Sequence, residues 1–242
     1  MSYLPRWTLS LIAVTVCACG QQSNDAQASS EAAVYSASEI SGLFYMQKYW
    51  IATRNLEKAI WYFAPDGNAY FNPDIGLAPD QLAQLKSANK GPYQVSGGEL
   101  SVTWGDGQTS SGPLEIVDGG FNWDTGMFLP VKPFTDAAQL VGGYEGGSSV
   151  TFSGNSSIVV KALELRADGS FSWEGSASFQ TDGMNTGGQS STSGRWQLEG
   201  YSLVLTADNG SVVRGISFPL DDEATPVNPD RMYFAGIAYA KK

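Results

Sequence analysis

The sequence predicts an all-β protein of two tandem antiparallel modules, each a meander or small up-and-down barrel, with one short helix inserted in the first. The first observation is composition, because 28 glycines accompany 12% aromatic and only 16% charged residues among 242. Such a mixture is typical of short strands joined by tight turns. The second observation is an apolar spacing of two, and the third is an internal repeat.

Apolar residues alternate with polar neighbours along several short runs, as they do in half-buried antiparallel strands. The alternating residues are Tyr93, Val95, Leu100, Val102, Trp104, Leu163, Leu165, Trp196, Leu198, Leu203 and Leu205. Asp66-Gly67, Asp168-Gly169 and Asn209-Gly210 follow or separate such runs. These dipeptides tolerate positive φ, so they predict hairpin turns.

The repeat appears when the chain is aligned with itself. Residues 91–102 match residues 194–205 at a constant offset of 103 (194 − 91 and 205 − 102). Residues 61–67 match residues 163–169 at an offset of 102 (163 − 61). The repeat predicts two related modules of about one hundred residues, a normal domain size. We place them at residues 41–136 and 137–242.

A helix is expected only in the first module. Pro79 begins a run in which Leu82 and Leu85 share one helical face, and Gly91 lies beyond its end.

Composition narrows the chemistry. The net charge of −10 argues against binding to nucleic acid, which requires clustered Lys and Arg. The sequence has no histidine, and its two cysteines, Cys17 and Cys19, precede the folded part. Ser-His-Asp catalysis, thiol catalysis and zinc sites are therefore excluded there. We expect no metal and no cofactor, and we interpret the acidic residues 221–223 as a solvated loop.

The N-terminal residues resemble an export signal. Arg6 precedes an uncharged stretch that ends at Ala18, which predicts a signal peptide at residues 1–18. Residues 16–19 resemble the lipobox of bacterial lipoproteins, with Cys17 at a position where that family prefers another small residue. The resemblance implies a lipid on Cys19, and Gly20 implies sorting to the outer membrane. Residues 19–40 then form a flexible tether; the alternative is simple cleavage and a free secreted protein.

The order of strands and turns within each copy resembles lipocalin-like (calycin-type) modules. The whole region from about residue 41 resembles a group of two-repeat, Gly/Ser-rich bacterial proteins to which no function is assigned. Their C-terminal copies end in a Gly-x-x-Tyr strand, which is seen here from Gly236 to Tyr239. At about one hundred residues, each module is short for a lipocalin, so the resemblance does not imply a deep ligand cavity.

The first module carries aromatic residues that the second lacks. Tyr45, Tyr49, Trp50 and Trp61 are the predicted ligand-binding residues, for a glycan or a small apolar ligand, and Lys48 could steer an acidic group. Residues 45–50 are the least strand-like part of the module. The competing interpretation is that these rings pack between the two modules.

Catalysis is the weaker hypothesis, and no catalytic residue is assigned. Asp66, Asp106 and Asp168 each precede a turn glycine, so turn formation explains them. The Gly/Ser/Thr-rich residues 175–194 are interpreted as a long mobile hairpin loop or ragged edge. The sequence therefore favours a non-enzymatic envelope lipoprotein with a binding or structural role. The alternative is a histidine-free, carboxylate-dependent hydrolase acting on polysaccharide.

Overall fold

The computed structural model describes residues 40–152, 155–181, 184–220 and 229–242. The predicted signal peptide, Cys19 and the acidic residues 221–223 lie outside the described residues. Within the described ranges, no helix is both long and apolar enough to cross a membrane. The protein is all-β, as predicted, with two barrel-like sheets.

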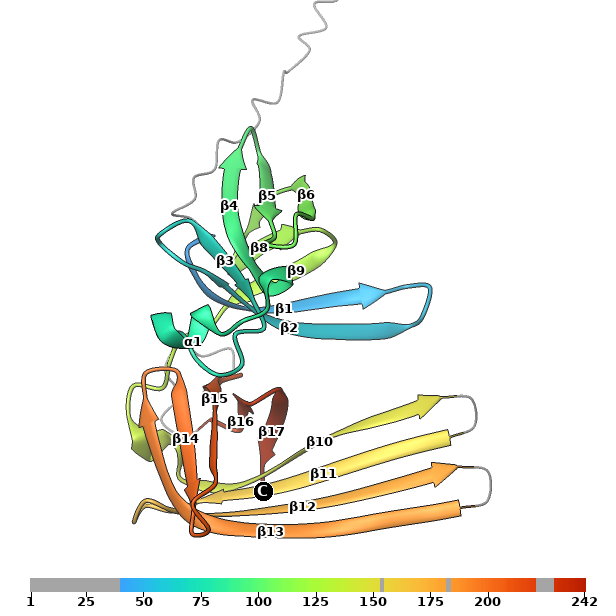
Figure 1. The fold of residues 1–242 in the computed structure, drawn as a ribbon, viewed down its shortest axis with the longest axis vertical. Coiled ribbons are helices and arrows are strands. Elements are labelled where there is room, and N and C mark those ends of the chain that lie inside the picture. The colour runs from blue at the N-terminus through green and yellow to red at the C-terminus, as the bar shows by residue number, and fades with distance from the viewer. Residues whose placement is uncertain (1–39, 153–154, 182–183, 221–228) are drawn as a thin grey trace, which may run out of the picture. The chain divides into compact units, whose positions relative to one another are not determined.

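The first sheet has nine strands and is nearly closed (Figure 1). Their order in the sheet is β6-β5-β4-β3-β2-β1-β9-β8-β7. The strands are β1 (Gly42–Trp50), β2 (Asn55–Phe63), β3 (Asn68–Phe71), β4 (Lys90–Ser96), β5 (Glu99–Thr103), β6 (Thr109–Pro113), β7 (Glu115–Val117), β8 (Gly120–Trp123) and β9 (Gly126–Pro130).

The second sheet is a closed eight-stranded barrel in which β10 pairs with β17. Its strands are β10 (Gly142–Phe152), β11 (Asn155–Leu165), β12 (Ser170–Thr181), β13 (Met184–Glu199), β14 (Ser202–Ala207), β15 (Val212–Pro219), β16 (Arg231–Phe234) and β17 (Ile237–Lys241). Closure is confined to one end of the barrel, because residues 147–152 of β10 pair with β11 alone and residues 184–192 of β13 pair with β12 alone.

The one described α-helix, α1 (Pro79–Ala83), lies where the sequence predicts it. Pro79 is at the helix start, where its missing N–H costs nothing. The side chain of Gln81 turns back and accepts a hydrogen bond from the backbone N–H of Ala78 at 3.1 Å. Two 3₁₀ turns, η2 (Ser87–Asn89) and η3 (Ala137–Leu140), precede β4 and β10.

The predicted duplication is present in the backbone hydrogen bonds. The N–H of Tyr93 donates to Gly67 O, and the N–H of Trp196 donates to Gly169 O, both at 2.9 Å. The two side chains repeat the match, because Tyr93 Oη donates to Ala64 O and Trp196 Nε1 donates to Arg166 O. The same turns and the same aromatic positions therefore organise both sheets.

In each copy, one glycine lies where a second backbone segment passes very close. A Cβ atom on Gly91 would lie 2.0 Å from Thr103 O, and one on Gly194 would lie 2.0 Å from Thr206 O. No side chain fits at such a distance from a backbone oxygen. Glycine is therefore required at both positions, because the neighbouring backbone segment leaves no room for a side chain.

The first sheet is nearly closed because one of its strands is broken. In the second barrel, β15 is continuous and pairs with β14 and then with β16. In the first, the equivalent stretch is divided at Leu114 into β6, which pairs with β5, and β7, which pairs with β8. Pro113, the last residue of β6, has no N–H to donate. Trp123 Nε1, on β8, donates to Leu100 O, on β5, at 2.9 Å.

The Gly/Ser-rich residues 175–194 do not form the loop that composition predicts. β12 and β13 pair continuously from Ser170 opposite Arg195 to Thr181 opposite Met184. Together with β10 and β11 they form the longest hairpins of the second barrel (Figure 1). The loop prediction is wrong because backbone pairing outweighs the weak strand preference of Gly and Ser. Residues 184–192 pair with β12 alone and so form an edge, which was the alternative prediction.

Three hydrophobic clusters hold the described chain together. One fills the first sheet and another fills the second barrel. The third, which we call the inter-barrel cluster, joins residues from both sheets. Its buried members are Leu43, Tyr45, Ile60, Ile216, Phe218 and Tyr233.

Candidate functional site

Strand β1 separates the four aromatic residues singled out in the sequence. Residues 45–50 belong to this strand, contrary to the expectation that they are the least strand-like part. Because side chains alternate along a strand, Tyr45 and Tyr49 lie on one face and Trp50 on the other. Trp61, on β2, lies on the same interior face as Trp50, and both line one cavity. The structure therefore brings together two of the four predicted residues.

Tyr45 belongs to the inter-barrel cluster. Its ring centroid is 6.1 Å from those of both Phe218 and Tyr233. Burial raises the pKa of the Tyr45 phenol, and Arg231 offsets part of that rise. For Tyr45 the structure thus favours the packing interpretation. Tyr49 is 57% exposed and lies outside the cavity lining.

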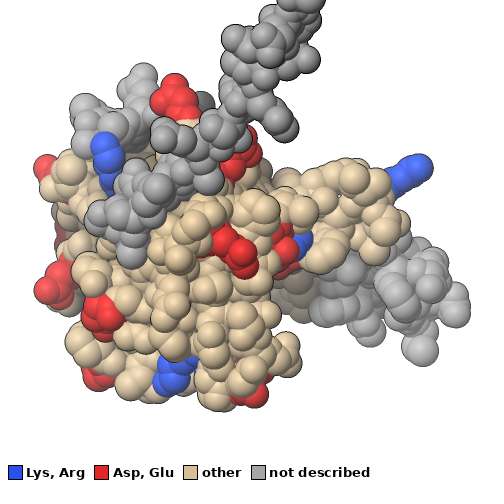
Figure 2. All heavy atoms as spheres, turned by 90° about the horizontal axis from the view of Figure 1, so that it is seen from above, with Lys and Arg blue, Asp and Glu red and all other residues tan. Residues whose placement is uncertain are grey.

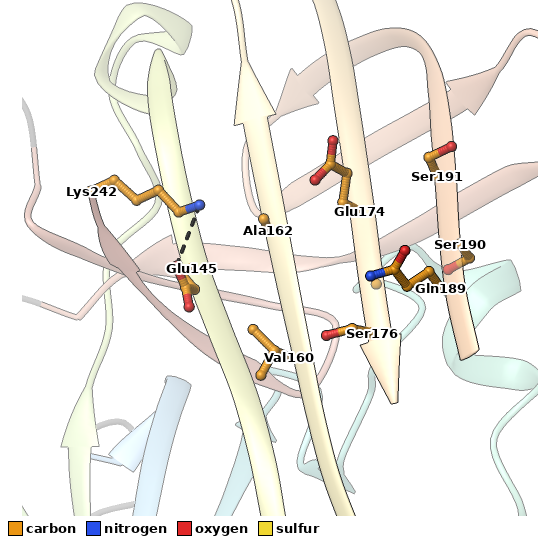
Figure 3. A pocket seen from close by; sticks show the side chains of 10 residues that line it. Glu145, Val160, Ala162, Glu174, Ser176, Gln189, Ser190, Ser191 and Lys242 are labelled. Carbon is orange, nitrogen blue, oxygen red and sulfur yellow. Dashed lines mark ion pairs between the residues drawn. The ribbon is translucent and has the colours of Figure 1, made fainter. Parts of the chain in front are cut away.

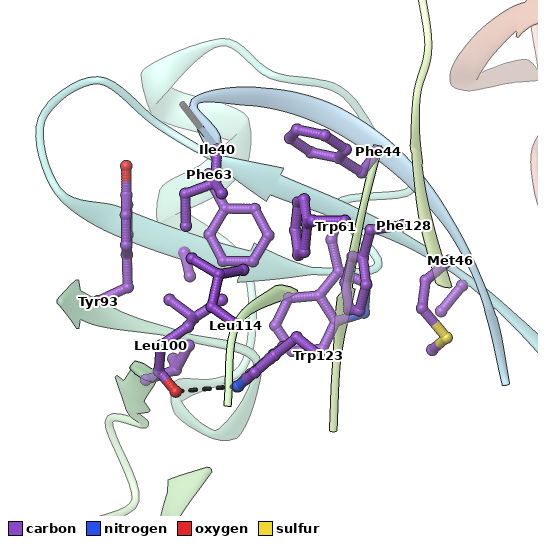
Figure 4. Close-up of a cluster of buried hydrophobic side chains, with 14 residues drawn as sticks. Ile40, Phe44, Met46, Trp61, Phe63, Tyr93, Leu100, Leu114, Trp123 and Phe128 are labelled. Atoms are coloured by element: carbon purple, nitrogen blue, oxygen red, sulfur yellow. Dashed lines mark hydrogen bonds between the residues drawn. The ribbon is translucent and has the colours of Figure 1, made fainter. Parts of the chain in front are cut away.

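The cavity lies at one end of the first barrel interior and has a volume of about 330 Å³. We call it the tryptophan cleft. Its lining residues are Met46, Lys48, Trp50, Glu57, Trp61, Phe71, Trp104, Ser110, Trp123, Asp124, Gly126 and Phe128. Figure 4 shows Trp61 in the middle of the packed aromatic cluster, between Phe63 and Trp123. A cavity of this size, mostly apolar with a few polar groups, is typical of small-ligand sites.

Three of the four tryptophans in the lining have a hydrogen-bond partner for the indole N–H. Trp50 donates to Glu57 Oε2 at 2.7 Å, Trp104 to Ser110 Oγ at 2.9 Å, and Trp123 to Leu100 O. Trp61 differs: its indole nitrogen is buried and has no partner among the residues that the structure describes. Its side chain is only 7% exposed.

Charged residues surround the entrance of the tryptophan cleft. Lys48 Nζ lies 2.9 Å from Asp124 Oδ2 and 4.5 Å from the centroid of the Trp50 ring. Only 12% of the Lys48 side chain is exposed. Its ammonium is therefore already paired and stacked, which argues against the role of steering an acidic group.

The hairpin that joins β1 and β2 ends in exposed apolar side chains. Ile51 is 84% exposed and Trp50 is 46% exposed, while Tyr49, Leu56 and Met127 are also exposed. Trp50 thus belongs both to this exposed surface and to the tryptophan cleft. Tyr49, Leu56 and Met127 share the outer face of the sheet, opposite the cleft.

The second barrel has different side chains at the equivalent strand positions. The shared register places Leu163 where the first barrel has Trp61, and Ala207 where it has Trp104. Val213 replaces Ser110, and Ile237 replaces Gly126. Smaller aliphatic groups stand where the first barrel places two indole rings. The tryptophan cleft is consequently a feature of the first copy.

A second hollow lies on the outer face of the second barrel and is polar (Figure 3). Glu145, Ala162 and Glu174 occupy one row across β10, β11 and β12. Two strand spacings of about 4.8 Å separate the two glutamates by roughly 10 Å at the backbone. Both are exposed, and Lys242 Nζ pairs with Glu145 at 3.3 Å. Such wet, exposed carboxylates do not form the enclosed groove that glycoside hydrolysis needs.

On the face shown in Figure 2, charged residues are spread apart and not gathered. Figure 2 shows one face with separate acidic residues and few cations. Among the described residues, no three His, Cys, Asp or Glu side chains form a group that could hold a metal ion. Asp168, for example, serves a turn: Ser170 donates to it through Oγ and N, and these hydrogen bonds lower the pKa of its carboxyl.

No protein-family model, curated protein or solved structure matches this chain. Sequence reasoning missed Trp104 and Trp123 as lining residues. A signal for Trp104 was present, since it continues the alternation of Leu100 and Val102 and so lies on the same face.

Proposed function

We propose that this protein is an exported, lipid-anchored binding protein of the bacterial envelope. It takes up a small apolar ligand with at least one ring in the tryptophan cleft, and it performs no chemistry on that ligand. The observation that carries the proposal is the cleft itself, a cavity of about 330 Å³ between tryptophan rings in the first barrel. Flat aromatic walls gain free energy by burying apolar rings in offset or edge contacts.

The polar groups of the cleft favour an apolar ligand over a glycan. Lys48 pairs with Asp124, Glu57 accepts from Trp50, and Ser110 accepts from Trp104. A sugar needs several free donors and acceptors to replace its lost water contacts. Here those groups already bind one another, whereas the ring faces offer apolar surface.

A matched pair of variants on β1 tests ligand binding. Trp50 lines the cleft and Tyr49 does not, yet both are substantially exposed. With the neutral fluorescent probe N-phenyl-1-naphthylamine, we expect Trp50→Ala to weaken binding at least about tenfold and Tyr49→Ala to leave it unchanged. Both variants should keep the wild-type unfolding midpoint. Absence of probe binding to the wild type, or equal losses in the two variants, would contradict the proposal.

The lipid anchor requires a separate experiment on the full chain expressed with its leader. Cys19→Ala should move the protein from the membrane fraction to the soluble fraction, because it removes the acceptor of the lipid. Cys17→Ala is the matched control and should stay with the membrane. Unchanged detergent-phase partitioning of Cys19→Ala would refute the anchor while leaving the cleft untouched.

A further inference from the structure

The indole N–H of Trp61 is an unused donor inside the tryptophan cleft. The ring is 93% buried (7% exposed) and its nitrogen has no hydrogen-bond partner in the described part of the chain. Buried polar groups are almost always paired, so each exception calls for an explanation. Trp61 lines the cavity, but its nitrogen is covered in the ligand-free protein. A ligand in the cleft can therefore pair with this N–H only when the neighbouring side chains move apart.

The contacts of the Trp61 ring are with other rings, and its N–H reaches none of the oxygen atoms in the cleft lining. Its ring stacks on Phe63 at 5.7 Å and meets Trp123 edge-on at 5.3 Å. An N–H directed at a ring face forms only a weak interaction. A Trp61 donor left in this environment therefore stays largely unsatisfied until something with a lone pair enters.

The charges at the entrance limit what that group can be. Glu57 and Asp124 contribute two carboxylates against the single ammonium of Lys48. The entrance thus has an excess of negative charge, and the whole chain carries −10. An anionic ligand would be repelled, whereas a neutral acceptor would not.

We propose that the ligand carries a neutral hydrogen-bond acceptor, such as a ring nitrogen or a carbonyl or ether oxygen, which accepts from Trp61 Nε1. This inference rests on the proposed function and specifies the class of ligand. The rings of the cleft bind the apolar part of the ligand. The Trp61 N–H distinguishes ligands that have an acceptor from ligands of the same shape that have none. A site with a buried donor rejects analogues that leave the donor unpaired.

Two probes of the same size test the inference. Naphthalene and quinoline differ by one ring nitrogen that can accept a hydrogen bond. Calorimetric titration gives the ratio of the naphthalene Kd to the quinoline Kd. Trp61→Phe keeps an aromatic ring and removes the N–H. We expect the ratio to fall about tenfold in Trp61→Phe, mostly through weaker quinoline binding.

Trp196→Phe is the matched control. It removes a buried indole N–H from the second barrel, away from the cleft, and that N–H already donates to Arg166 O at 3.0 Å. We expect an unchanged probe ratio and a lower unfolding midpoint, because the carbonyl loses its partner. Trp61→Phe should show the reverse, with an altered ratio and a smaller change in midpoint.

The outcomes separate the two proposals. If neither probe binds the wild type, the proposed function fails. If both bind and the ratio is the same in Trp61→Phe, the function stands and the acceptor inference is wrong. Should Trp61→Phe not fold, the wild-type indole resonance of Trp61 decides. A downfield shift with quinoline that naphthalene does not cause supports the hydrogen bond, and equal shifts refute it.

Discussion

The two barrels share their turns and differ in their interiors. Backbone hydrogen bonds at Gly67 and Gly169 are the same, and so are the close crossings at Gly91 and Gly194. Among the interior positions between them, Trp61 and Trp104 of the first copy correspond to Leu163 and Ala207 of the second, whereas Phe71 corresponds to Trp173. The comparison indicates that the turn and crossing positions specify this fold, which leaves side chains between them able to change.

One pair of positions shows how the interiors change together. In the first barrel Met46 stands beside Gly126, where an added Cβ would lie 3.2 Å from the methionine Sδ. In the second, Gly146 stands beside Ile237, where an added Cβ would lie 2.8 Å from Ile237 Cγ2. The large and the small residue have exchanged strands. Close packing explains the exchange, because only one of the two positions can be large.

The largest expected loss of stability comes from substituting the two glycines beside which the backbone passes closely, Gly91 and Gly194. Gly91→Ala and Gly194→Ala each place a Cβ 2.0 Å from a backbone oxygen, so each should lower the free energy of unfolding by at least about 3 kcal/mol. Gly188→Ala is the control, because nothing lies within 4 Å of its added Cβ. Urea unfolding measures all three. Tolerance of alanine at only one crossing would break the claimed equivalence of the two copies.

The next effect concerns the exchanged pair. Met46→Gly removes core volume and should cost about 2–4 kcal/mol, and Gly126→Ile overfills the same space at about 1–3 kcal/mol. The double variant copies the second barrel. We expect it to be more stable than the sum of the single losses by at least about 1.5 kcal/mol. Additive losses of stability would mean that residues 46 and 126 do not share one space in the core, as the comparison with Gly146 and Ile237 predicts they do.

Much of this fold could be predicted from the sequence, because its organising signals are local. Asp-Gly and Asn-Gly turns, an apolar spacing of two and a constant offset specify strands and their order. Residues 175–194 could not be predicted, since their pairing depends on neighbouring strands and not on their own composition. The contact from Trp123 to Leu100, between β8 and β5, joins residues 23 apart and likewise has no local signal.

The candidate site was only partly visible in the sequence. Proximity along the chain grouped Tyr45 with Trp50, but strand alternation places them on opposite faces. Tyr45 packs between the barrels, while Trp50 joins Trp61 from the adjacent strand. Trp104 and Trp123 come from strands whose place in the sheet required the full pairing order.

A smaller effect tests the contact between the barrels. Tyr201 Oη donates to Val131 O at 2.7 Å, so Tyr201→Phe should lower the free energy of unfolding by about 1 kcal/mol at neutral pH. Burial raises the Tyr201 pKa from 10.0 to about 12, which favours the neutral phenol in the folded state. This contribution to stability is complete below pH 10 and is lost as the pH rises from 10 to 12.

Unfolding at pH 8 and pH 11 measures both parts of that prediction. The wild type should lose more stability between these two values than Tyr201→Phe does. Tyr233, whose pKa is also raised by burial, contributes to the remaining loss in both proteins. An identical pH dependence of wild type and variant would contradict the contact.

The most direct test of the central claim follows the indole N–H resonances of the protein without its leader as N-phenyl-1-naphthylamine is added. Of its six tryptophans, Trp173 and Trp196 belong to the second barrel. The other four line the tryptophan cleft. Our account predicts shifts for these four and none for Trp173 or Trp196. Shifts of equal size in both barrels, or shifts confined to the second, would contradict it.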